Sequence, residues 1–127
     1  MSTNRDNDIK FFREFATQLA ISINVAQLGR VVSVSADKKK ADIQPMALNQ
    51  SGSKRGMLLN VAVARHLQQK IRLEGESSYL DQIKKGDVAI VVFLDRSVEN
   101  WGGGNSDFTL GSLRMHNVND AVVVGVL

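Results

Sequence analysis

The sequence predicts a mainly β protein, a small antiparallel barrel of five to six strands with an N-terminal amphipathic helix. From Gln27 onward, short apolar segments alternate with turn residues at hairpin spacing, which is typical of antiparallel strands. Before that point, apolar residues recur at spacings of three and four, the pattern of one helical face. We therefore expect two parts, a helical extension over residues 1–26 and a barrel over residues 27–127.

The N-terminal segment has the pattern of one long amphipathic helix. Asn7 or Asp8 can cap its start, and the β-branched residues after Ala20 predict that it frays near Asn24. An apolar stripe needs a surface to cover. That surface is either the sheet of the same domain or another subunit, and the sequence favours neither. The stripe comprises Ile9, Phe12, Phe15 or Ala16, Leu19 and Ile23.

Short apolar runs beyond the helix predict the strands. The apolar run over residues 88–94 predicts a strand buried on both faces, and the last strand is too apolar to stay uncovered. Pro45 suits a strand end, because proline cannot donate to a ladder. With this strand count, a barrel like the OB (oligonucleotide/oligosaccharide-binding) fold is the natural candidate. The predicted strands are 29–35, 41–45, 57–64, 88–94 and 121–127, with 67–73 as a weaker one.

Composition narrows the class of protein. The 127 residues include no cysteine, which excludes disulfides and thiolate metal sites. No apolar run reaches about 18 residues, so we expect no stable membrane insertion, and the polar N-terminus does not resemble a secretory signal. The formal net charge is only +3. The densest basic clusters lie beside predicted turns, where lysines are commonly just solvated; they are Lys38–Lys40, Lys54–Arg55 and Lys84–Lys85.

Residues with metal or phosphate chemistry are sparse. The two histidines, His66 and His116, are far apart in the sequence and lack neighbouring ligands, whereas a zinc site needs about four. The glycines at 102–104 lack the following helix and Lys-Ser/Thr pair of a phosphate-binding loop. We therefore expect no metal site, no cofactor and no catalytic residue.

Two carboxylates invite an acid–base interpretation. Asp95 and Glu99 are four residues apart and would share one face if residues 95–101 formed a helical turn. The simpler interpretation is a turn in which Asp95 forms an ion pair with Arg96. We therefore expect no enzyme here.

Single-stranded nucleic acid is bound by aromatic platforms within a basic groove. Three of the seven aromatic residues lie on the predicted helix, Phe93 lies in the buried run, and Trp101 adjoins glycines. None lies on an alternating polar strand beside lysines, so we expect no nucleic-acid partner. An OB-type single-stranded nucleic-acid-binding protein is the alternative function, and it would depend on Lys38–Lys40.

Three segments carry a family resemblance. Residues 28–34 and 41–45 look like an opening hairpin, and Gly86–Trp101 looks like the family's most distinctive strand and turn. Arg114–Val122 is similar to a closing segment in which a histidine and an Asp-Ala pair precede the last strand. In this order, the segments resemble the OB domain of central-spike proteins from the baseplates of contractile phage tails and tailocins.

The resemblance implies a structural role in the virion or in a phage-tail-like particle, made in the cytoplasm of a bacterial host. The implied position is a trimeric spike or tail-tip plug, with the baseplate hub and tail-tube proteins as partners. In that family a β-helical needle follows, with a metal-binding His-x-His tip. This sequence ends at Leu127 and has no His-x-His. We therefore expect a truncated spike that does not encode the needle, or an adaptor for a separate tip protein.

Physical reasoning also favours a homotrimer. One small barrel leaves only a few kcal/mol of net stability, and a chain with an amphipathic helix and an apolar terminal strand would gain from threefold association. The expected interface residues are Ile9, Phe12, Phe15, Leu19, Ile23 and Trp101.

Overall fold

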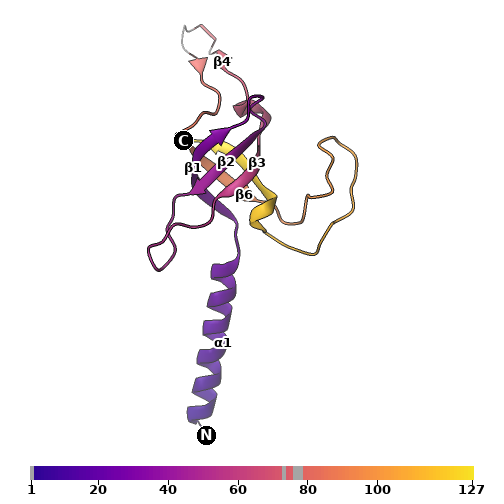
Figure 1. Cartoon of the computed structure of the whole chain (residues 1–127). Helices are drawn as coiled ribbons and strands as arrows, with labels where there is room; N and C mark the ends of the chain where they lie inside the picture. The colour runs from indigo at the N-terminus through magenta and orange to yellow at the C-terminus, as the bar shows by residue number, and fades with distance from the viewer. Residues whose placement is uncertain (1, 73, 76–78) are drawn as a thin grey trace.

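The computed structural model describes residues 2–72, 74–75 and 79–127. It consists of one helix that projects from a small barrel (Figure 1). Two short 3-10 turns, η1 and η2, lie in the connections. The elements are α1 (Ser2–Ser22), β1 (Ala26–Val34), β2 (Lys40–Pro45), β3 (Leu58–Val63), η1 (Arg65–Leu67), β4 (Ile71–Arg72), β5 (Tyr79–Leu80), β6 (Val88–Phe93), η2 (Val118–Asp120) and β7 (Ala121–Val126).

The five main strands close into a barrel in the order β1-β2-β3-β7-β6. This confirms the predicted mainly β fold, with an OB-like barrel and one N-terminal helix. The barrel is not antiparallel throughout, because β3 and β7 pair in parallel while the other neighbours are antiparallel. An odd number of strands cannot alternate direction around a closed ring, so at least one pair must be parallel.

The interior of the barrel is one apolar cluster to which every barrel strand contributes. The prediction that residues 88–94 are buried on both faces is wrong for β6. Its side chains alternate between buried and half-buried, because a barrel has a single interior face. The largest core side chains are Phe93, Ile43, Ile83, Val31, Val91 and Val123.

Gly29 of β1 is buried and faces this interior beside Ile43 of β2. It pairs with Pro45 of β2 and with Ala89 of β6. A Cβ at this position would overlap Cγ2 of Ile43, which is fully buried. Glycine is therefore required for the close approach of β1 to the core.

We expect Gly29→Ala to lower the free energy of unfolding by about 1–3 kcal/mol, because overpacking forces neighbouring side chains and backbone to shift. Gly125→Ala in β7 is the control, since its Cβ would make an ordinary contact of 3.6 Å with Ile90 Cδ1. Denaturant titration of both variants checks the prediction. Equal stability of the two variants would contradict it.

The weaker strand predicted over residues 67–73 is not part of the barrel. Only Ile71–Arg72 (β4) is a strand, and it pairs with β5 in a separate two-stranded sheet. The described barrel strands already form a closed ring, so they leave no edge for another strand. Residue 73 lies outside the described residues.

Two helical predictions also need correction. The helix does not begin at Asn7 or Asp8 but already includes Ser2, because a capping preference of about 1 kcal/mol does not stop a helix where no glycine or proline intervenes. It ends at Ser22, close to the predicted Asn24. Residues 95–101 form turns rather than a helical turn, because Asp120 and Ser97 side chains bind the backbone there.

Candidate functional site: the exposed helix and the loop that closes the barrel

The apolar stripe of α1 lies in solvent. Every side chain from Arg5 to Ser22 is exposed, and α1 extends away from the barrel (Figure 1). The stripe therefore does not pack on the sheet of its own domain in the described part of the chain. The predicted helix contacts are all between 46% and 66% exposed, namely Ile9, Phe12, Phe15, Leu19 and Ile23.

This exposed apolar surface continues from the helix onto the barrel wall. A cleft of about 590 Å³ lies where the chain leaves α1 and enters β1. Nearby, Asn24 Nδ2 donates to the carbonyl oxygen of His116 at 3.3 Å, which fixes the link to the closing loop. The apolar residues that line the cleft are Ile21, Ile23, Val25, Ala26, Leu28, Met46 and Ala47.

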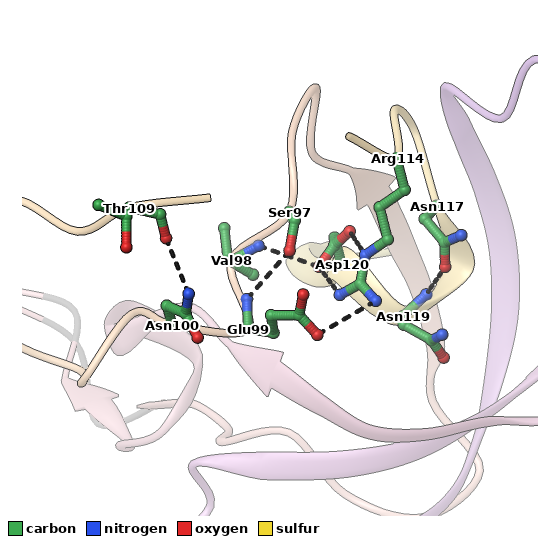
Figure 2. Close-up of polar contacts among 9 residues, drawn as sticks. All are labelled: Ser97, Val98, Glu99, Asn100, Thr109, Arg114, Asn117, Asn119 and Asp120. Carbon is green, nitrogen blue, oxygen red and sulfur yellow. Dashed lines mark hydrogen bonds and ion pairs between the residues drawn. The ribbon is translucent and has the colours of Figure 1, made fainter. Parts of the chain in front are cut away.

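A buried ion pair closes the barrel at the other end of the chain. Asp120, at the end of η2, is 1% exposed. Arg114 donates from Nε to Oδ2 at 2.8 Å and from Nη2 to Oδ1 at 2.7 Å, and Val98 N donates to Oδ1 at 3.1 Å. Figure 2 shows these contacts. A two-point arginine–carboxylate pair fixes both distance and orientation, so Asp120 ties the loop after β6 to the start of β7.

Further polar contacts hold the ends of this loop (Figure 2). The hydroxyl of Ser97, which is buried, accepts from Glu99 N at 3.4 Å, and Glu99 Oε2 lies 3.7 Å from Arg114 Nη1. Asn100 Nδ2 donates to the carbonyl oxygen of Thr109 at 3.0 Å. The loop is long and exposed, but these bonds fix its path.

The ion pair lowers the pKa of the Asp120 carboxyl below its ordinary value of 3.8. The hydrogen bonds from Arg114 are the main cause, burial acts in the opposite direction, and the Val98 N–H and the arginine charge lower the pKa further. The carboxylate is thus held ionised as a structural acceptor.

This shift predicts a loss of stability in acid. Because the folded pKa is depressed, the contribution of Asp120 is fully present above its unfolded pKa and is lost as the pH falls through the folded pKa. We therefore expect the denaturant concentration at the unfolding midpoint to fall as the pH drops below 3.8, the ordinary pKa of the carboxyl, and to fall less steeply in Asp120→Asn. Denaturant titrations at several pH values measure the difference. Identical pH profiles would contradict the assignment.

Asp95 and Glu99 do not share a helical face. The two residues lie in turns and face different partners, since Glu99 faces Arg114 while Asp95 pairs with Arg96 at 2.9 Å. The predicted Asp95–Arg96 ion pair is confirmed. Asp95 Oδ1 also lies 3.4 Å from Nε2 of His116. Within the described residues, no three histidine, cysteine, aspartate or glutamate side chains gather as metal ligands.

Trp101 lies away from the helix stripe. It lines a second cleft, of about 810 Å³, together with Phe108, Lys39, Lys40 and Arg65. Its Nε1 donates to the carbonyl oxygen of Gly104 at 2.7 Å. Trp101 and Phe108 belong to the long loop after β6 and not to a strand, but this loop brings them to the same cleft as the lysines at the β1–β2 turn.

Sequence reasoning missed the Arg114–Asp120 pair. The available signal was an acidic residue immediately before an apolar terminal strand, with an arginine six positions earlier. A charge at the entrance to a buried strand needs a partner, and Arg114 is a basic residue close enough in the sequence to supply one.

The structure is an OB-like barrel module with an exposed helical arm. The barrel is closed, and the Arg114–Asp120 ion pair holds the loop after β6. A family model described as the phage protein Gp138 N-terminal domain matches residues 28–125. The chain belongs to this family and is a phage protein. No curated protein matches it. In the described part of the chain, no helix is long and apolar enough to cross a membrane.

Proposed function

We propose that this protein is a non-enzymatic structural component of the baseplate in a contractile phage tail or tailocin. It acts there as a central spike or tail-tip plug seated on the hub. The observation that carries the proposal is the helix stripe, which is apolar, about half exposed and uncovered by the chain's own barrel. An apolar surface of this kind marks a protein–protein contact.

The assembly is a homotrimer that contacts the hub and tail-tube proteins. Membership of the phage family and the barrel fold support this proposal, and threefold symmetry would let three helices share one apolar seam. Trp101 and its cleft are a second contact surface, for the hub or for a separate tip protein.

The test measures the position of the chain in the particle and the mass of its assembly in solution. Gold-labelled antibodies against the chain should bind purified particles at the distal end of the tail. Light scattering of the full chain at micromolar concentration should give three times the 13.9 kDa chain mass. Particles without label would overturn the location, and a monomer would overturn the trimer.

A second candidate function, binding of single-stranded nucleic acid, is favoured by one observation. Trp101 and Phe108, each over 40% exposed, share a cleft with Lys39, Lys40 and Arg65, and exposed aromatics among cations can stack bases. If this function holds, a labelled oligonucleotide should bind less tightly as salt rises. Replacing both lysines by glutamine should then weaken binding, whereas no binding at low salt would exclude this function.

A further inference from the structure

The exposed stripe of α1 has the spacing of a coiled-coil seam. Its apolar positions alternate between steps of three and four residues, which is the a/d pattern of a heptad repeat. Ile9 and Ala16 occupy a positions, Phe12 and Leu19 occupy d positions, and Ile23, the first residue after α1, continues the spacing. The spacing continues without interruption to the last turn of α1, so these positions form one continuous apolar seam along the helix.

The seam has no cover within the described chain. Its large side chains keep 46–66% of their surface exposed. The seam from Ile9 to Leu19 spans about 15 Å at 1.5 Å per residue, and helices in proteins draw most of their stability from packing of an amphipathic face. Burial against an identical seam would supply the missing stabilisation.

The width of the apolar face favours more than two helices. Phe15 at a g position and Ala20 at an e position flank the a/d seam. A two-stranded coil needs only the a and d positions, whereas helices in a larger bundle are apolar at e or g as well. Phe15 is 55% exposed and would be covered by a third helix.

The charges beside the seam select a parallel arrangement. Asp8 occupies a g position, and Arg13 occupies the e position of the next heptad. Residues at these positions face each other between neighbouring helices of a parallel, in-register coil, and such pairs set orientation. Both side chains are exposed and free to reach across.

From this seam we propose that the α1 helices of three copies of this chain form a parallel, in-register coiled coil. Ile9, Phe12 and Leu19 lie in its core, and Asp8 pairs with Arg13 of the adjacent copy. The proposal rests on the proposed homotrimer. Three barrels hold the bases of their helices together through the short link after Ser22, and this raises the effective concentration of the helices.

Because the chain contains no cysteine, a single introduced cysteine gives a clean test of register. Ile9→Cys places a thiol at an a position, and Asn7→Cys places one at the outward f position. Mild oxidation should convert Ile9→Cys to a covalent dimer on a non-reducing gel and leave Asn7→Cys mostly unlinked, since a disulfide needs Cα atoms within about 7 Å. Equal cross-linking of the two, or none at Ile9→Cys, would overturn the parallel register.

Two adjacent phenylalanines provide a matched pair for the seam itself. Phe12 lies in the seam and is 66% exposed, whereas Phe11 lies outside it and is 62% exposed. Phe12→Ala should raise the concentration at which half the chains are assembled by about tenfold or more, equivalent to about 1.4 kcal/mol. Phe11→Ala should change it much less. Equal effects would overturn the proposal.

The charge pair is tested by exchange. Arg13→Asp should weaken assembly by placing like charges across the interface, and Asp8→Arg combined with Arg13→Asp should restore it. Failure of the exchange to restore assembly would overturn the Asp8–Arg13 pairing.

These outcomes are separable from the proposed function. If the helices do not cross-link but antibody labels the tail tip, the coil is wrong and the structural role stands. If the helices cross-link but the particles carry no label, the coil stands and the tail-tip role is wrong.

Discussion

Replacing Asp120 by asparagine is expected to lower the free energy of unfolding by about 1–3 kcal/mol, because the change removes the charge and one acceptor oxygen from the hydrogen bonds that hold Arg114. Asp120 is 1% exposed, and its carboxylate accepts from both Arg114 and Val98. Asparagine keeps the size of the side chain but loses the charge and one acceptor. Denaturant unfolding at fixed protein concentration measures the loss.

Asp95→Asn is the control for this experiment. Asp95 also forms an ion pair with an arginine, Arg96, but its side chain is 70% exposed. Exposed pairs contribute about 0–1 kcal/mol, so this variant should unfold close to the parent. A small effect of Asp120→Asn, similar to that of Asp95→Asn, would show that the pair does not lock the loop.

Replacing Phe93 by alanine is expected to cost about 3–5 kcal/mol, because it removes a large buried side chain and leaves a cavity. Phe93 is 2% exposed and is the largest fully buried side chain of the barrel. It lies at the end of β6, opposite Ala121 of β7. The cavity would therefore lie beside the Arg114–Asp120 ion pair.

Phe108→Ala is the matched control, since Phe108 is 42% exposed in the long loop. Its loss should change the free energy of unfolding by much less than the loss of Phe93. Thermal or denaturant unfolding of Phe93→Ala and Phe108→Ala measures this difference in stability. If the two variants lost equal stability, Phe93 would not lie at the centre of the core.

The barrel was predictable because its signal is local. The apolar run of β6 and the hairpin of β1 and β2 show their patterns within a few residues. In the turn between the hairpin strands, the Asp37 carboxylate accepts from Lys39 N and Lys38 has a φ of 64°. The small β4–β5 sheet was not predictable. The alternation in residues 67–73 suggested one more strand, but it could not show that the barrel is a closed ring with no edge for that strand.

The functional surfaces were predictable only in part. The helix stripe follows from spacing alone, but its exposure does not, because either a sheet or a partner could cover the same pattern. Trp101 meets Lys39 and Lys40 only through the path of a long loop, and no local pattern specifies that path. The Arg114–Asp120 ion pair holds the loop in that path. The pair was not predicted, because the sequence did not show that Asp120 is buried and therefore needs a charged partner.

The most direct test of the structural role is a reconstruction of the tail tip by electron cryomicroscopy, from particles that contain this chain. We expect three copies of the barrel around the tail axis at the distal end, seated on the hub, with their helices together along the axis. Absence of the chain from the distal end of the tail, or a single copy there, would contradict the account.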